Sequence, residues 1–298
     1  MKNIIIDTDP GKDDFLAILM LILSKQVKIR AITTVMGNSI LTNTTANAKY
    51  LLKLTGSPIP LYAGAAMPLV RKFMPGKVMG ETGLAGINVA PVKKVVDEAS
   101  RILATTNKDD QLDLLLLGPL TNLAQALVKN PSLESKINSL VIMGGAIKCR
   151  GNTNPYAEFN IFTDPDSAKL VFDTTIPKVL IPLDLCYQIP LYMSDFERIT
   201  NLRYRDTILK IVKPYIEALK KYEGQDGAIV YDALAAYYLL NPSAFTLSPM
   251  CVDIETTQLS NLGQTMVDYN KRPNVLVATS LDKAKFVSDF ITIINAGD

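Results

Sequence analysis

Four aspartates, Asp7, Asp9, Asp13 and Asp14, stand within eight positions near the start of the chain. Like charges this close repel one another, and a hard divalent cation offsets the repulsion. Carboxylate oxygens suit Ca²⁺ or Mg²⁺ better than softer metals. The alternative is a solvated acidic turn that caps a helix, for which one or two aspartates suffice. The spacing therefore favours a metal site.

The residues around these aspartates predict how they are held. The branched apolar run Ile4–Ile6 precedes them and is typical of a buried strand, and the apolar run Phe15–Leu23 follows and is typical of a buried helix. A strand, an acidic loop and a helix in this order place a site at the carboxyl end of an α/β sheet.

The same order of strand, polar turn and helix recurs along the chain, which favours a mostly parallel, helix-flanked (Rossmann-like) open sheet. No internal repeat, low-complexity tract or linker interrupts it, so we expect one α/β domain over residues 1–298 with its site at the carboxyl ends of the strands. The pattern predicts strands over Val27–Val35, Pro58–Gly64, Leu112–Leu117, Ser139–Met143 and Lys178–Leu183, and helices over Leu41–Leu54, Val92–Thr106, Ser167–Phe172 and Leu281–Ile294.

Three further segments have less regular patterns. Met67–Pro91 is rich in Gly and Pro, which suits a mobile flap over a site or an ordinary surface loop. Ser194–Tyr222 is predicted as a polar, peripheral helix, and soon after it Asp232 heads an apolar helix. Met250–Thr279 is predicted to form a pair of β segments around a turn at Gly263.

Composition limits the partners and the compartment. Lys and Arg number 31 against 29 Asp and Glu, a balance that does not favour nucleic acid or an anionic membrane surface. The three cysteines are far apart and lack CxxC spacing, which fits a reducing compartment. No signal peptide precedes the first strand, and Phe15–Leu23 is too short to span a bilayer. We therefore expect a cytoplasmic protein.

The sequence contains no histidine. This excludes a Ser-His-Asp or Cys-His catalytic site and a His-ligated zinc site. Any proton transfer must use Asp, Glu, Tyr, Lys, Cys or water.

Known loop motifs can be tested on the spacing of the first loop. A P-loop fails because Ile6 and Asp13 stand where Gly and Ser/Thr are needed, and an EF-hand from Asp7 fails because Lys12 and Ile18 replace its Gly and Glu. An aspartate-nucleophile phosphatase, in which Asp7 attacks phosphorus, remains open. It leaves the other acids and the amide-rich segment 151–160 unexplained.

As a set, several motifs resemble the inosine-uridine nucleoside hydrolases, in family order and over nearly the whole chain. They are Asp7–Asp14, Thr34–Asn38, Gly118–Asn122, Met143–Gly145, Gly151-Asn152, Ala157–Asn160, Asp164-Pro165 and Val252–Asp268.

The resemblance implies hydrolysis of the N-glycosidic bond of ribonucleosides to ribose and free base, as in nucleotide salvage. It implies a Ca²⁺ ion, with Asp9 as the general base on the attacking water, and a homodimer or homotetramer. The implied metal ligands are Asp9, Asp14, the backbone carbonyl of Thr121, and Asp232. The implied substrate-binding residues are Asp13, Asn38, Glu158 and Asn160 at the ribose, and Met143, Asn152 and Phe159 in the sugar and base pocket.

Elementary chemistry is compatible with these roles. The glycosidic bond breaks through an oxocarbenium-like transition state, which nearby carboxylates stabilise, and amides and acids satisfy the hydroxyls of ribose. Each residue alone also has a simpler interpretation. Asn38 and Asn152 suit turns, Glu158 suits a surface ion pair, and Asp232 suits a helix N-cap. Met143 and Phe159 suit a core.

The chain departs from the family where many members carry histidine. Tyr231 stands just before the last implied calcium ligand, and Met79 stands in the 67–91 segment. We expect the acid that protonates the leaving base to be Tyr231 or water, with Tyr222, Tyr237 and Tyr238 as alternatives. If the acid is lost altogether, the chain is a non-catalytic ribonucleoside or ribose binder.

Overall fold

The computed structural model describes residues 1–76, 78–104 and 112–297. Its centre is an eight-stranded sheet in the order β3-β2-β1-β4-β5-β6-β12-β9. Every neighbouring pair is parallel except β12 and β9. The mostly parallel sheet predicted from the sequence is therefore confirmed. Its strands are β1 (Lys2–Thr8), β2 (Val27–Thr34), β3 (Leu61–Ala63), β4 (Leu112–Leu116), β5 (Ile137–Met143), β6 (Lys178–Ile181), β9 (Phe245–Met250) and β12 (Val275–Leu281).

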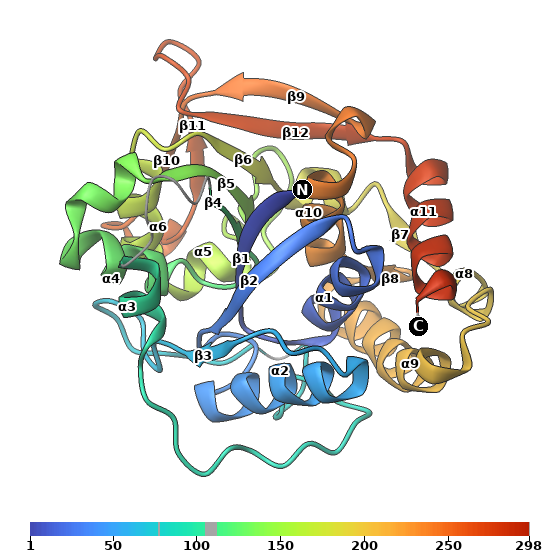
Figure 1. Ribbon diagram of the computed structural model, residues 1–298. Helices are drawn as coiled ribbons and strands as arrows, with labels where there is room; N and C mark the ends of the chain where they lie inside the picture. The colour runs from blue at the N-terminus through green and yellow to red at the C-terminus, as the bar shows by residue number, and fades with distance from the viewer. Residues whose placement is uncertain (77, 105–111, 298) are drawn as a thin grey trace.

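Helices cover both faces of the sheet (Figure 1). Alternate side chains of β1 enter different cores: Ile4 and Ile6 pack on one side, and Ile5 packs on the other. Burial on both faces explains why the strands read as continuous apolar runs. On the Ile4 side lie α1 (Lys12–Ser24), α2 (Leu41–Thr55), α9 (Leu202–Glu223), α10 (Tyr231–Leu240) and α11 (Lys283–Ala296); on the Ile5 side lie α3 (Ala99–Ala104), α4 (Thr121–Lys129) and α6 (Pro165–Phe172).

Short elements connect these layers. They are α5 (Phe159–Thr163), α7 (Leu183–Cys186), α8 (Met193–Glu197), and the antiparallel pairs β7 (Pro190–Leu191) with β8 (Ala228–Ile229) and β10 (Val252–Ile254) with β11 (Thr265–Val267). The β10–β11 pair confirms the predicted pair of β segments around Gly263.

The strand order creates the position of the site. The chain adds β2 and β3 on one side of β1, and then β4, β5 and β6 on the other side. At such a switch point the loops leaving the carboxyl ends diverge and leave a crevice, which is where open α/β sheets bind ligands. Asp9, Asn38 and Leu117 follow β1, β2 and β4 into this crevice.

The helix predicted over Val92–Thr106 is wrong over most of its length. Only α3, Ala99–Ala104, is helical, and Thr105 and Thr106 lie outside the described residues. The N–H groups of Val92 and Glu98 donate to the carbonyls of Thr42 (3.2 Å) and Ala63 (2.8 Å). These tertiary bonds hold the segment extended along the sheet edge.

The polar helix predicted over Ser194–Tyr222 is split into α8 and α9, and α9 is not peripheral. One face of α9, with Tyr204, Ile208 and Tyr215, is fully buried, whereas Lys213 and Glu217 on the other face are exposed. The 67–91 segment contains no helix or strand within its described residues, as predicted.

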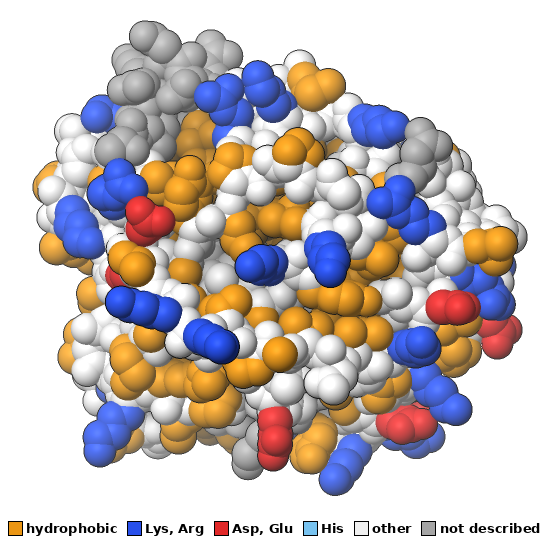
Figure 2. All heavy atoms as spheres, turned by 60° about the horizontal axis from the view of Figure 1, so that its bottom comes forward, with side chains coloured by type: hydrophobic (Ala, Val, Ile, Leu, Met, Phe, Trp, Pro, Cys, Tyr) orange, Lys and Arg blue, Asp and Glu red, His pale blue; other side chains and the backbone are white. Residues whose placement is uncertain are grey.

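The surface is mixed in character. On the face shown in Figure 2, which is the lower side of Figure 1, Lys and Arg side chains lie dispersed among hydrophobic and uncharged ones. Within the described ranges, no helix combines the length and the apolar character that a membrane span requires.

Candidate active site

A cavity of about 490 Å³ lies at the carboxyl ends of the central strands. All seven predicted substrate residues line it, as do Tyr231 and Asp232, although they come from distant parts of the chain. The lining includes Asp13, Asn38, Met143, Asn152, Glu158, Phe159, Asn160, Tyr231 and Asp232, together with Leu117, Tyr222 and Glu223.

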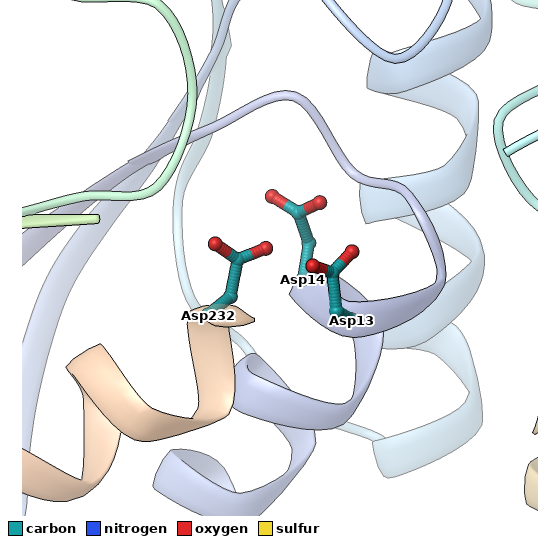
Figure 3. Close-up of side chains that lie close together, drawn as sticks. All are labelled: Asp13, Asp14 and Asp232. Atoms are coloured by element: carbon teal, nitrogen blue, oxygen red, sulfur yellow. The ribbon is translucent and has the colours of Figure 1, made fainter. Parts of the chain in front are cut away.

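Three aspartates gather beside this cavity (Figure 3). Asp13 and Asp14 come from the first turn of α1 and Asp232 from the first turn of α10, and one carboxylate oxygen of each lies within 4.8 Å of the others. Burial raises the pKa of all three carboxyls, and mutual repulsion raises those of Asp13 and Asp232 further. The positive ends of two helix dipoles offset only part of this repulsion.

Asp9 lies next to this group, directly after β1, and is fully buried. Its Oδ2 accepts the N–H of Asn38 at 2.6 Å, while its Oδ1 has no hydrogen-bond partner among the described residues. Two glycines admit the carboxylate: a Cβ on Gly37 would lie 2.0 Å from Oδ2, and a Cβ on Gly118 would lie 2.8 Å from Oδ1. Burial, followed by the charge of Asp14, raises the pKa of Asp9.

These carboxylates fit a hard cation. Oδ1 of Asp13, like that of Asp9, is buried without a hydrogen-bond partner in the described part of the chain. Unpaired buried carboxylate oxygens are costly unless a cation or water binds them. Because the donors are all oxygen, Ca²⁺ or Mg²⁺ suits the site better than softer metals.

The structure does not bring Thr121 to the cavity. Thr121 is buried in the first turn of α4, where its hydroxyl donates to Asp164 at 2.6 Å, and it is not a lining residue. Leu117, at the end of β4, does line the cavity, and its carbonyl accepts the Nδ2 of Asn160 at 2.7 Å. Leu117 is therefore a candidate to supply a main-chain oxygen at the cavity.

Glu158 and Asn38 are fixed by specific hydrogen bonds. Glu158 caps α5, and its carboxylate accepts the N–H groups of Asn160 (2.9 Å), Gly145 (3.1 Å) and Ile161 (3.2 Å). Burial raises the pKa of Glu158 to about 7. Asn38 donates from Nδ2 to an oxygen of Asp14 at 3.1 Å. Asn38 lies in a bend, as its type suggests, whereas Glu158 is buried rather than in a surface ion pair, and Asp232 is not the N-cap of α10, which is Val230.

Apolar residues form another part of the lining. Met143 and Phe159 belong to it, and Met74, Val78 and Met79 of the 67–91 segment lie on it too. A Cβ on Gly76 would lie 3.2 Å from the Phe159 ring, so glycine allows the segment to approach that ring.

Sequence reasoning missed Glu223, the last residue of α9. Its Oε2 accepts the hydroxyl of Tyr231 at 2.5 Å and that of Tyr187 at 3.4 Å. The absence of histidine, together with a Tyr-Glu pair nine residues before Tyr231-Asp232, was the signal that could have found it. Of the alternative acids, Tyr222 lines the cavity, whereas Tyr237 and Tyr238 do not.

Asp7, the nucleophile that a phosphatase would require, does not line the cavity. Its Oδ1 accepts hydrogen bonds from Thr33 and from Asn122, the latter at 2.7 Å. Asp7 is buried, with 1% of its surface exposed, and its hydrogen bonds link the end of β1 to β2 and to α4.

Comparison with known proteins gives a consistent result. Residues 4–288 match the model of the inosine-uridine preferring nucleoside hydrolase family. The chain is 34% identical over 297 residues to a pyrimidine-specific ribonucleoside hydrolase RihA of Klebsiella pneumoniae, covering 95% of each chain. It is 34% identical over 299 residues to an inosine-uridine preferring nucleoside hydrolase of Crithidia fasciculata, covering 96% of this chain and 95% of the other. A solved purine-preferring ribonucleoside hydrolase from Gardnerella vaginalis superposes with a TM-score of 0.88 at 26% identity, covering 99% and 98% of the two chains.

Proposed function

The chain belongs to the inosine-uridine preferring nucleoside hydrolase family and is an N-glycosyl hydrolase; we propose that it cleaves ribonucleosides with a Ca²⁺ ion and a water molecule activated by Asp9. The observation that carries this proposal is the buried cluster of Asp13, Asp14 and Asp232, with Asp9 linked to it through Asn38 and two unpaired carboxylate oxygens, beside a cavity lined by amides and acids.

The ion would be held by Asp9, Asp14 and Asp232, with Asp13 beside them, and by a main-chain oxygen. We assign that last ligand to Leu117 in place of Thr121, because Leu117 follows β4 at the cavity, whereas Thr121 lies in the first turn of α4 and its hydroxyl donates to Asp164. When bound, such an ion would make the attacking water a better nucleophile.

Asp9 then takes the proton of the attacking water. Its unpaired Oδ1 is available for that proton, while the N–H of Asn38 fixes the other oxygen. As the bond from C1′ to the base breaks, positive charge develops on the ribose ring, and the surrounding carboxylates stabilise it.

The remaining lining residues would recognise the substrate. Asp13, Asn38, Glu158 and Asn160 present acids and amides to the ribose hydroxyls, each of which would cost about 1–3 kcal/mol if left unpaired. Asn152, Met143 and Phe159 would lie against the sugar and the base.

The test is base release from a panel of purine and pyrimidine ribonucleosides, in metal-free buffer and after addition of calcium. We expect free base and ribose only with calcium, and the panel gives the base preference. Saturable nucleoside binding without release would instead identify a non-catalytic binder. Release of phosphate from phosphate monoesters with Mg²⁺ would identify a phosphatase.

The proposal also covers the oligomeric state and the cellular location of the protein. We infer a homodimer or homotetramer, supported by the exposed apolar side chains of Ile40, Val70 and Met74, and light scattering tests it. We infer a cytoplasmic location, supported by three cysteines that are all free thiols.

A further inference from the structure

Glu223 has a defined orientation within the cavity. Both phenols, Tyr231 and Tyr187, donate to the same oxygen, Oε2, and Asn152 forms a side-chain hydrogen bond to the carboxyl as well. Because Oε2 accepts these two hydrogen bonds, a proton on Glu223 would be carried by Oε1. Glu223 itself lines the cavity, so its carboxyl can reach a ligand there.

The hydroxyl of Tyr231 is a poor proton donor to a substrate. It already donates to Glu223, and burial raises its pKa well above the ordinary phenol range. Burial likewise raises the pKa of Glu223, and this outweighs the phenol hydrogen bonds that lower it. A carboxyl whose pKa is raised is a better general acid than a phenol whose pKa is raised further above neutral pH.

The surroundings of Glu223 favour its neutral form. Within the described residues, no Lys or Arg forms an ion pair with it. The titratable groups that interact with it are all acids or phenols: Asp13, Glu158, Tyr187, Tyr215 and Tyr231. Burial raises the pKa of Glu223, and the charge of Glu223 in turn raises the pKa values of Asp13, Glu158 and Tyr215.

We propose that Glu223 is the general acid that protonates the departing nucleobase, and that Tyr231 and Tyr187 orient it. This proposal rests on the proposed function. It replaces the prediction that Tyr231 or water performs this step.

The oxygen of water bonds to C1′ and loses a proton to Asp9, while the bond between C1′ and the base nitrogen breaks and leaves its electron pair on the base. The proton on Oε1 of Glu223 moves to the base. After release of ribose and base, Glu223 regains a proton and Asp9 loses one to solvent, so the sum is nucleoside plus water giving ribose plus base.

The experiment compares two leaving groups in the calcium-loaded enzyme. Inosine and uridine need a proton on the departing base, whereas p-nitrophenyl β-D-ribofuranoside releases a stable anion. Glu223→Gln should lower kcat for the nucleosides by about 10³-fold, within the range typical of general acids, and leave the nitrophenyl riboside within about threefold. Glu217→Gln, on the exposed face of the same helix, is the matched control and should change neither.

The pH profile gives a second reading. Because the acid must be protonated, wild-type kcat for nucleosides should fall as pH rises through the pKa of Glu223, and this limb should be absent for the nitrophenyl riboside and in Glu223→Gln. Equal loss on both substrates would assign Glu223 a role at the sugar and overturn the proposal, as would no loss on either. If the wild type cleaves no riboside at all, the proposed function itself fails.

Discussion

Two regions of the cavity use buried carboxyls in opposite ways. The acidic floor, Asp9, Asp13, Asp14 and Asp232, places several carboxylates together and leaves two of their oxygens without hydrogen bonds. The phenol wall, Tyr187, Glu223 and Tyr231, surrounds a single carboxyl with hydrogen-bond donors. Unpaired oxygens in a cluster suit a cation, and a single carboxyl whose pKa is raised by burial suits a proton. Carboxyls therefore act on both sides of the scissile bond. The neighbouring residues decide whether a given carboxyl binds a cation or carries a proton.

The largest effect should come from the acidic floor. Asp9→Asn keeps the shape of the side chain but removes the base, so we expect kcat to fall by about 10³-fold at saturating calcium. The loss should be equal for uridine and for the nitrophenyl riboside, because both need the attacking water. Asp226→Asn, at a side chain that is 79% exposed, is the control. An unchanged rate in Asp9→Asn would remove the base from this position.

Glu158 differs from the carboxyls of both regions, because it is buried and accepts hydrogen bonds from main-chain N–H groups. Its pKa is raised from 4.5 to about 7, so the folded state binds a proton that the unfolded state releases. Its contribution to the free energy of unfolding is present below about pH 4.5 and is lost as pH rises toward and above 7, by up to about 3 kcal/mol. Denaturant unfolding from pH 5 to 8 should therefore show a smaller loss in Glu158→Gln than in wild type. Parallel pH dependences would contradict the assignment.

Tyr231→Phe should separate orienting from proton delivery. Removing the 2.5 Å hydrogen bond loosens Glu223, and we expect a loss of about tenfold on inosine and uridine and none on the nitrophenyl riboside. A loss as large as that of Glu223→Gln would mean that the phenol itself delivers the proton. Turnover equal to wild type would leave Tyr231 without a role.

The smallest effect is expected from Tyr187→Phe. The hydroxyl of Tyr187 lies 3.4 Å from Oε2 of Glu223, which is long for a hydrogen bond between oxygens. Nucleoside turnover should fall by about twofold, measured beside Tyr231→Phe under the same conditions. A larger loss of turnover in Tyr187→Phe than in Tyr231→Phe would show that the lengths of these two hydrogen bonds do not determine how well Glu223 is oriented.

The acidic floor could be predicted from the sequence because three of its four members are close in the chain. Local spacing therefore reveals their mutual repulsion, and the strand and helix runs around them predict their place at the sheet edge. The phenol wall could not be predicted, because Tyr187 follows α7, Glu223 ends α9 and Tyr231 begins α10, and the three meet only in the folded chain. A polar helix pattern over 194–222 does not show that one of its faces is buried.

Neither the proposed main-chain ligand nor the extended stretch before α3 could be predicted from the sequence. The choice between Thr121 and Leu117 depends on where β4 ends and on which carbonyl faces the cavity, and side-chain pattern carries no signal for that. The helix expected over Val92–Thr106 failed because tertiary bonds to Thr42 and Ala63 override local propensity.

The most direct test of the division between floor and wall measures kcat/KM for uridine and for the nitrophenyl riboside in wild type, Asp9→Asn and Glu223→Gln, all with saturating calcium. The ratio of the two values should stay at its wild-type level in Asp9→Asn and shift about 10³-fold toward the nitrophenyl riboside in Glu223→Gln. The same ratio in all three proteins would contradict separate roles for the two regions.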